Sequence, residues 1–149
     1  MNHNPDESTN PNAAVLRSAI AGLTARDRAA VLACFHNEGI LELPYERSLP
    51  RLDKAGLGSL LEMLFDLYGK FSITLTHIYD LVDADTLIAR YEGDCVGRGD
   101  NVPYANNYIA VFEFTDGLIS YWREYDNPMI TDSAQRAHAA AAAAGVGDS

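Results

Sequence analysis

The chain has 149 residues, of which 48% are hydrophobic and 21% charged, as expected for one globular domain with a modest core. The formal net charge of −10 and the absence of any Lys/Arg run argue against nucleic acid or an anionic membrane as a partner. No apolar run approaches the ~20 residues needed to cross a bilayer, and the polar start MNHNPDESTNPN has no signal-peptide core. We therefore expect a cytoplasmic protein.

The first third of the chain predicts a polar tail, two helices and a short strand. Residues 1–11 are rich in Asn, Pro and Asp and predict a disordered N-terminal tail. Asn12 is a plausible N-cap for a helix, and a second helix is predicted over Thr24 to Phe35 from its apolar spacing. The segment ILELPY at 40–45 alternates as a short strand that its proline ends.

The middle of the chain predicts a third helix and then strands. Residues 54–68 present one broad apolar face at helical spacing. Residues 71–82 and 86–97 are rich in β-branched and aromatic residues, which predicts two strands. The alanine-rich tail, 132–149, is predicted to be flexible or helical. With helices early and long strands late, the domain over 12–131 belongs to the α+β class.

Two further strands are predicted between Tyr104 and Pro128. The turn at Thr115-Asp116-Gly117 separates two aromatic and β-branched runs, which is a strong hairpin signal. Alternation places Asn106 and Tyr108 on one face of the first strand, and Trp122 and Glu124 on one face of the second. Polar groups able to do chemistry therefore lie among apolar ones, which indicates a sheet that curls around a pocket.

The final hairpin carries a resemblance to a known family. The segments NNYIAVFEFTDGLI and WREYDNP, together with the element order, resemble the nuclear transport factor 2-like superfamily, in its SnoaL-like and phenazine-biosynthesis A/B-like branch. The positions that fit the pattern of that branch are Tyr104, Asn106, Tyr108, Phe112, Asp116, Gly117, Ile119, Arg123, Glu124, Tyr125, Asn127 and Pro128. The resemblance implies a cone-shaped, strongly curved antiparallel sheet that three helices close over a deep apolar pocket. It also implies chemistry without a cofactor and a homodimer packed through the outer face of the sheet.

Glu124 is the first candidate for catalysis. The segment WREY resembles the last strand of limonene epoxide hydrolase, where the acidic position projects into the cavity and transfers protons. A carboxyl group in an apolar pocket has its ionised form disfavoured, so its pKa rises and it can act as acid or base near neutral pH. The alternative is a structural carboxylate held by a neighbouring Arg or Tyr.

Arg90 and Glu92 are the second candidates, since they share one face of the 86–97 strand. Their spacing resembles the Arg-x-Asp pair that completes the epoxide hydrolase triad with the last-strand acid, here with Glu in place of Asp. Two carboxylates bridged by a guanidinium can hold and activate a water. The alternative is an exposed salt-bridged pair on the convex face, where Asp94 also lies.

Other side chains are predicted to shape the pocket. His77 is predicted to share a face with Leu75 and Tyr79. It is either a proton relay for Glu124 or a residue of the core or pocket wall whose hydrogen bonds are already made. The candidates for substrate binding are Trp122, Asn106, Tyr108, Tyr45 and Tyr68. Neither the cysteines nor the histidines show ligand spacing, and no phosphate-binding or dinucleotide motif is present, so we expect no metal and no cofactor.

Three functions remain open from the sequence. The first is a small cofactor-independent enzyme that acts on a hydrophobic oxygenated metabolite, such as a polyketide, with Glu124 transferring a proton during isomerisation, cyclisation or dehydration. The second is an epoxide hydrolase or epoxide-opening cyclase that uses Arg90, Glu92 and Glu124. The third is a non-catalytic small-molecule-binding protein, in which Glu124 is fully paired and has an ordinary acidic pKa.

Overall fold

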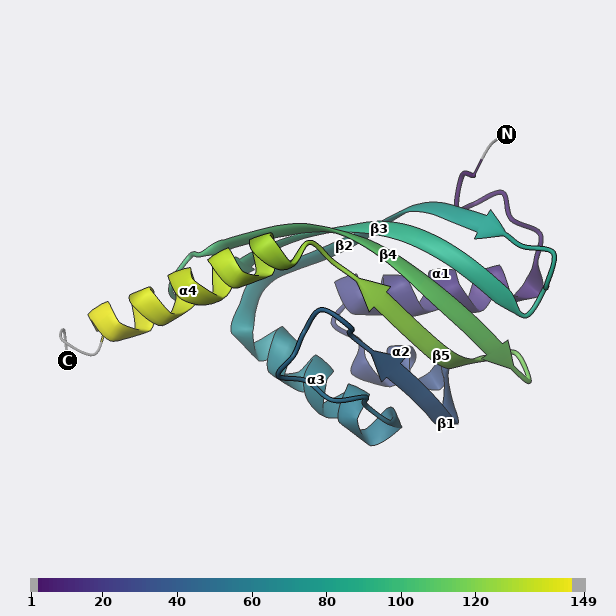
Figure 1. Ribbon diagram of the computed structural model, residues 1–149, viewed down its shortest axis with the longest axis horizontal. Helices are drawn as coiled ribbons and strands as arrows, with labels where there is room; N and C mark the ends of the chain where they lie inside the picture. Colours follow the sequence, from purple (N-terminus) through teal and green to yellow (C-terminus); the bar gives the residue numbers. More distant parts are fainter. Residues whose placement is uncertain (1–2, 146–149) are drawn as a thin grey trace.

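The computed structural model describes residues 3–145, which fold into one curved sheet with helices on its concave side (Figure 1). The elements in chain order are α1 (Pro11–Thr24), α2 (Arg28–Ala33), β1 (Phe35–Glu42), α3 (Lys54–Leu67), β2 (Tyr68–Asp80), β3 (Thr86–Gly97), β4 (Pro103–Thr115), β5 (Leu118–Tyr125) and α4 (Pro128–Gly145). The predicted α+β class is confirmed.

The five strands lie in the order β1-β5-β4-β3-β2. Strands β2 to β5 pair antiparallel, as predicted. Strand β1 instead runs parallel to β5, so the sheet is mixed rather than wholly antiparallel. Three helices, α1, α2 and α3, cover the concave face (Figure 1).

Side-chain caps set the start of the first three helices. Asn10 accepts a hydrogen bond from the Asn12 backbone N–H at 2.9 Å, and Pro11 occupies the first helical position. Helix α1 therefore begins before Asn12, the residue predicted as its cap. Asp27 and Asp53 accept from the backbone N–H three residues onward at the starts of α2 and α3. Each such cap satisfies a backbone donor that the helix itself leaves free.

The turn between β4 and β5 forms where the sequence predicts it. Asp116 and Gly117 have φ angles of 53° and 76°, the two positive values that a tight two-residue hairpin turn requires. The alternation that follows from this turn directs Trp122 and Glu124 toward the helices.

The hydrophobic core lies between the concave face and the three helices. Its largest fully buried side chains come from every element of this layer: Leu16, Val31, Phe35, Leu61, Ile78, Leu87, Phe112 and Ile119. Each contributes about 1.5–3 kcal/mol by leaving water. This core fixes the curvature of the sheet and hence the position of the site.

The N-terminal residues 3–10 pack against the sheet. The Ile78 backbone N–H donates to the His3 carbonyl at 3.0 Å, and Ser8 Oγ donates to Asp80 at 2.7 Å. Residues 3–10 thus lie against β2, rather than forming the disordered tail predicted for 1–11, whose first two residues lie outside the described range.

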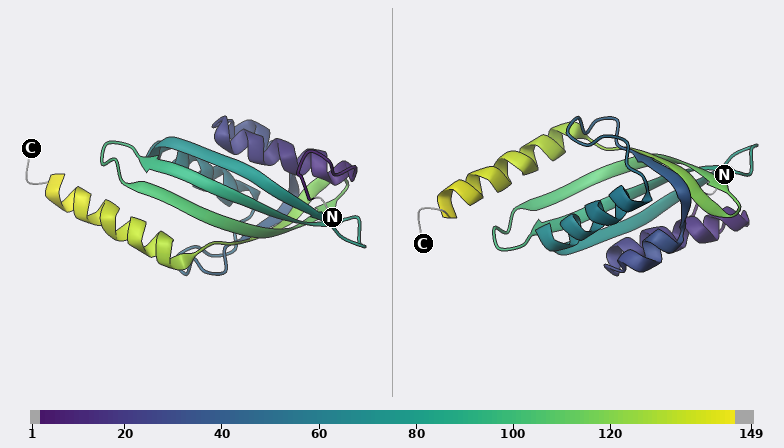
Figure 2. Two further views of the ribbon diagram at one scale, coloured as in Figure 1. Left: turned by 90° about the horizontal axis from the view of Figure 1, so that it is seen from above. Right: turned by 90° about the horizontal axis from the view of Figure 1, so that it is seen from below.

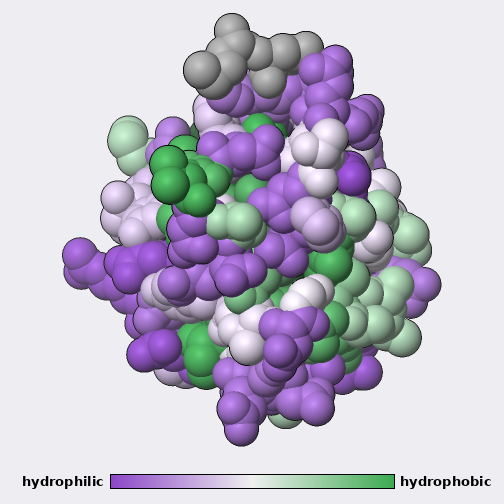
Figure 3. Space-filling view, turned by 90° about the vertical axis from the view of Figure 1, so that its right-hand side faces the viewer, coloured by the Kyte–Doolittle hydropathy of each residue, from purple (hydrophilic) through white to green (hydrophobic). Residues whose placement is uncertain are grey.

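The alanine-rich tail is helical up to Gly145, and its residues 146–149 lie outside the described range. Helix α4 leaves the end of β5 and extends away from the body of the protein (Figures 1 and 2). Within residues 3–145, no helix is both long and apolar enough to span a membrane. The opposite end of the molecule carries the β2–β3 and β4–β5 turns. On its surface, hydrophilic residues lie between small hydrophobic patches (Figure 3).

A close approach at Gly39 gives a first testable prediction. A Cβ at this position would lie 2.6 Å from Phe35 Cε1 and 2.9 Å from the Ile119 carbonyl oxygen, at the point where β1 shifts register against β5. We expect Gly39→Ala to lower the free energy of unfolding by about 1–3 kcal/mol through overpacking, as measured by urea denaturation. In the control Gly69→Ala the nearest heavy atom is 3.7 Å away, and equal losses in the two variants would contradict this account.

Candidate active site

The concave side of the sheet encloses a cavity of about 360 Å³, a size suited to a small organic molecule. Helix α3, the segment after β1 and the start of α4 form its other walls. The leucines that α3 contributes are Leu57, Leu60, Leu61, Leu64 and Leu67. The strands contribute Ile73 and six aromatic side chains, namely Tyr68, Phe71, Tyr91, Tyr104, Tyr108 and Trp122. The cavity is therefore apolar over most of its wall.

Glu124 lies on the cavity wall within a short chain of hydrogen bonds. The Tyr91 hydroxyl donates to Glu124 Oε1, and the same hydroxyl oxygen accepts from Trp122 Nε1 at 3.2 Å. Tyr91 is buried on strand β3, whereas Glu124 lies on β5. No ion pair reaches Glu124 in the part of the chain that the structure describes. Its carboxylate thus has a neutral donor, not a cation, as its partner.

The environment of Glu124 raises its pKa. Desolvation disfavours the ionised carboxylate and is the main cause; the Tyr91 hydrogen bond opposes it, and the negative charge of Asp126 adds to it. The resulting pKa is about 7, so the group is poised to both give and take a proton near neutral pH. Burial and the Glu124 charge also raise the pKa of Tyr91 well above its usual value, which keeps this phenol protonated as a donor.

Four tyrosines continue the wall from Glu124 along the sheet. Tyr91 stacks on Tyr108 with ring centroids 5.2 Å apart, and Tyr68 stacks on Tyr104 at 5.9 Å. The Tyr108 hydroxyl donates to the Tyr104 hydroxyl at 2.9 Å, joining the two pairs. All four rings line one side of the cavity.

Tyr104 is a site residue that the sequence reasoning did not single out as a binder. Its hydroxyl oxygen accepts from Tyr108 and from Asn106 Nδ2, the latter at 3.0 Å. Its own proton has only a long contact with Thr131 Oγ1 at 3.4 Å. Tyr104 lines the cavity, so this proton is available to a ligand. The signal in the sequence is the alternation of Tyr104, Asn106 and Tyr108 on one face.

Arg90 and Glu92 do not join this site. They alternate with Tyr91 along β3, and because Tyr91 faces the cavity its two neighbours face outward. Both side chains are exposed on the convex face, where Arg90 Nη1 lies 3.4 Å from the Tyr79 hydroxyl. The predicted convergence of Arg90, Glu92 and Glu124 is therefore wrong. The alternative is right about the exposure of Arg90 and Glu92, but no ion pair joins these two residues, both of which lie in the described part of the chain.

His77 also lies on the outer face. A β-bulge between Leu75 and His77 leaves Thr76 unpaired and places His77 opposite Arg90, which reverses the face that simple alternation predicts. Its Nδ1 lies 2.9 Å from Thr76 Oγ1, and its ring stacks on Tyr79. His77 therefore cannot serve as the predicted relay to Glu124.

Asn106 is buried but does not line the cavity. Its Nδ2 contacts the Tyr104 hydroxyl, the Asn127 carbonyl and Thr131 Oγ1 at 3.0–3.2 Å. Its Oδ1 accepts from the backbone N–H groups of Asn107 and Asn127. With its amide fully occupied, Asn106 anchors the start of α4 and orients Tyr104, in place of the predicted contact with substrate.

The other four predicted binders, Trp122, Tyr108, Tyr45 and Tyr68, lie on the cavity wall. Tyr45 is 56% exposed and packs edge-on against Tyr125, which places it at the mouth. Tyr68 begins β2 rather than ending the preceding helix. Trp122 holds Tyr91 through its indole N–H. Contact of these residues with a substrate stays a prediction.

Helix α4 adds wall residues that the sequence reasoning missed. Thr131, Ala134, Gln135 and His138 all line the cavity. Their spacing follows one stripe of a helix, and this pattern in the alanine-rich tail was the available signal. Within residues 3–145, no three His, Cys, Asp or Glu side chains group closely enough to hold a metal ion.

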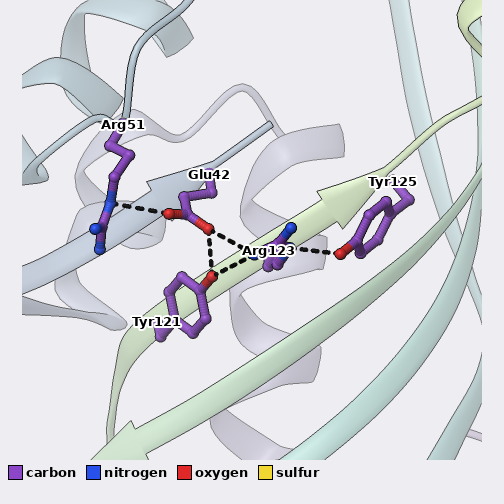
Figure 4. A network of polar contacts seen from close by, with 5 residues as sticks. All are labelled: Glu42, Arg51, Tyr121, Arg123 and Tyr125. Carbon is purple, nitrogen blue, oxygen red and sulfur yellow. Dashed lines mark hydrogen bonds and ion pairs between the residues drawn. The ribbon is translucent and has the colours of Figure 1, made fainter. Parts of the chain in front are cut away.

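A separate polar network holds the outer face of β1 and β5 (Figure 4). Glu42 pairs with Arg51 at 2.9 Å and with Arg123 at 3.2 Å, and it also accepts from the Tyr121 hydroxyl. Arg123 Nε donates to the Tyr125 hydroxyl at 2.5 Å. Arg123 thus points away from its neighbour in sequence, Glu124, and the sheet separates its charge from the cavity.

The raised pKa of Glu124 predicts a pH-dependent stability. The folded protein keeps this proton up to about pH 7, whereas an unfolded glutamate loses it near 4.5. The folded state therefore binds more protons between these values, and the free energy of unfolding falls as pH rises through this window, by at most about 3 kcal/mol. Glu124→Gln should remove this fall, and urea denaturation across the window measures it. The exposed control Glu92→Gln should keep the fall, and equal slopes for wild type and Glu124→Gln would contradict the assignment.

This chain resembles known proteins in sequence and in fold. The uncharacterised protein YesE of Bacillus subtilis (strain 168) is 27% identical over 124 residues, covering 80% of this chain and 83% of that protein. An uncharacterised PhzA/B-like protein of Pseudomonas aeruginosa, PA3332, is 30% identical over 97 residues, covering 64% and 69% of the two chains. The crystal structure of a candidate isomerase from Bacillus subtilis superposes with a TM-score of 0.77 at 25% identity, covering 90% and 96%. The model of the SnoaL-like domain matches residues 16–122, and the chain belongs to this family, with a nuclear transport factor 2-like fold.

Proposed function

We propose that the protein is a small acid/base enzyme that moves a proton within an apolar, oxygenated metabolite, as an isomerase, cyclase or dehydratase does. The observation that carries this proposal is Glu124, a carboxyl group on an apolar cavity wall with a pKa near 7 and a single phenol as its donor. The size and the aromatic wall of the cavity support a hydrophobic substrate with one or more rings.

The proton would pass through Glu124 in two steps. The ionised carboxylate takes a proton from a carbon next to a carbonyl, which leaves an enolate; the protonated carboxyl then returns that proton to another carbon or to a leaving oxygen. Tyr91 donates to the carboxylate throughout, because its own raised pKa prevents it from ionising. The Trp122 indole holds the Tyr91 oxygen in place during both steps.

We propose Tyr104, a cavity-lining hydroxyl, as the donor to the negative oxygen of such an enolate. It receives hydrogen bonds from Tyr108 and Asn106, and a hydroxyl that accepts two hydrogen bonds donates its own proton more strongly. A donor that is fixed in advance in an apolar site stabilises developing charge without reorganisation.

The two other functions left open by the sequence have less support. The epoxide hydrolase constellation lacks two of its three members in the cavity, because Arg90 and Glu92 are exposed on the outer face. A purely binding role predicts an ordinary acidic pKa for Glu124, whereas burial raises it.

Proton exchange from a simple ketone tests the role of Glu124 without knowledge of the natural substrate. We expect the wild-type protein to accelerate the exchange of the C1 protons of 2-tetralone in D₂O, as followed by proton NMR. The rate should rise with pH through about 7 as Glu124 ionises. Glu124→Gln should lower the accelerated rate by a factor of about 10² or more, the usual contribution of a general base.

The outer-face variant Glu92→Gln is the matched control and should exchange at the wild-type rate, since this carboxylate is exposed. Exchange that is equal in wild type and Glu124→Gln, or that is no faster with wild type than in buffer, would refute the proposal.

Tyr104→Phe tests the stabilisation of the enolate oxygen. This change removes one donor from the cavity and keeps the ring that stacks on Tyr68, so we expect the exchange rate to fall by about 10- to 100-fold. The pH at which the rate rises should stay near that of wild type, because Glu124 is intact. The control Tyr79→Phe alters a tyrosine beside Arg90 on the outer face, and a loss of similar size in both variants would contradict the role given to Tyr104.

A further inference from the structure

We infer that Asp126 is a further substrate-contacting residue, whose free carboxylate oxygen accepts a hydrogen bond from a hydroxyl group next to the carbonyl that Tyr104 holds. The preferred substrate is then a hydroxy ketone, with its two oxygens on neighbouring carbon atoms, rather than a plain ketone. This inference rests on the proposed function, in which Tyr104 donates to the carbonyl oxygen, and adds to it the chemical class of the substrate.

Asp126 lies on the same side of the sheet as Glu124. It follows Glu124 by two residues, directly after the end of β5 at Tyr125, and the twofold period of a strand directs both side chains the same way. Both residues line the cavity. At about 3.3 Å per residue their backbone positions are roughly 7 Å apart, so one small ligand can contact both carboxyl groups.

One oxygen of Asp126 is held and the other is free. Thr131, in the first turn of α4, donates from its hydroxyl group to Asp126 Oδ2 at 2.7 Å. The amide of Asn106 donates to the same hydroxyl oxygen at 3.2 Å, which fixes it in turn. Asp126 Oδ1 has no hydrogen bond or ion pair with residues 3–145. The one buried side-chain polar atom without a partner in this range belongs to His138, so Oδ1 of the half-buried Asp126 is accessible.

Tyr104 places a donor close to this acceptor. Its hydroxyl oxygen lies 3.4 Å from Thr131 Oγ1, the oxygen that donates to Asp126. The Tyr104 oxygen and Asp126 Oδ2 are therefore at most about 6 Å apart, the sum of these two distances. All three residues line the cavity. A donor and an acceptor at this spacing match a carbonyl and a hydroxyl group on neighbouring carbon atoms.

The charge of the cavity wall favours a hydroxyl group over an anionic group on the ligand. The carboxylates that line the cavity are Glu46, Glu124 and Asp126, and no Lys or Arg among the described residues joins them. Glu46 is already engaged, because it accepts from Ser48 and from the Gln135 amide. The free oxygen of Asp126 gains most from a ligand donor, since hydrogen bonds to an ionised acceptor are roughly twice as strong as neutral ones. A negatively charged ligand group is instead repelled.

Two ketones that differ by one hydroxyl group test this contact. Trp122 is the only tryptophan of the chain and lines the cavity, so its indole N–H resonance reports binding in NMR titrations. We expect wild-type protein to bind 2-hydroxy-1-tetralone about tenfold more tightly than 1-tetralone, the usual contribution of a hydrogen bond to a charged group. Asp126→Ala removes the acceptor, so the preference should fall to about twofold or less.

Three controls separate this contact from a structural role. The methyl ether 2-methoxy-1-tetralone keeps the added oxygen but cannot donate, and wild-type protein should bind it no more tightly than 1-tetralone. Asp132→Ala alters an exposed aspartate next to Thr131 on α4 and should keep the wild-type preference. In wild-type protein the ¹³C resonance of the Asp126 carboxyl group should shift more with the hydroxy ketone than with 1-tetralone, a readout that does not depend on the folding of any variant.

An unchanged preference in Asp126→Ala, equal binding of the hydroxy and methoxy ketones, or no preference in wild-type protein would overturn the contact. Proton exchange from 2-tetralone is a separate result, because that ketone has no hydroxyl group. Normal exchange by wild-type protein without a preference for the hydroxy ketone refutes this inference alone. A preference that depends on Asp126, together with exchange that Glu124→Gln leaves unchanged, refutes proton transfer and leaves the contact in place.

Discussion

The hydrogen bond between Tyr91 and Glu124 is the interaction on which the site depends. The two residues lie on β3 and β5, with β4 between them. Ala110 of β4 pairs with Glu124 on one side and with Ala89 on the other, and its small side chain leaves room for the Tyr91 hydroxyl to reach across. The sheet must also curve for this reach to succeed. The apolar core, the curvature and one small residue together bring the pair into contact.

The sheet separates the charges of its outer face from the carboxyl group in the cavity. Arg123 and Glu124 are adjacent in the chain, yet their side chains lie on opposite faces because of the twofold period of a strand. On the outer face, Arg123 pairs with Glu42 in a partly exposed network (Figure 4). A guanidinium on the inner face would lower the pKa of Glu124. The same alternation that builds a salt-bridged outer face therefore keeps the inner carboxyl near neutrality.

Local patterns in the sequence predicted much of this arrangement. The Asp116-Gly117 turn and the alternation beyond it place Trp122 and Glu124 toward the pocket, because turn geometry and strand period are properties of a few neighbouring residues. The faces of Arg90 and Glu92 depend instead on which side of β3 the helices cover. The bulge at Thr76, which turns His77 outward, has no local signal in its own residues. The docking of α4 depends on Asp100 and Asn106, which lie far from it in sequence.

The shared features of the family extend beyond the matched segment. The family match covers residues 16–122, which form the core, the aromatic wall and most of the apolar cavity. Glu124 lies just after this segment, in the stretch WREYDNP, which resembles the same branch. The fold determines the position of the cavity, whereas the chemistry depends on the few polar side chains that enter it. Relatives that share the fold can therefore differ in reaction and in substrate through the few side chains that enter the cavity.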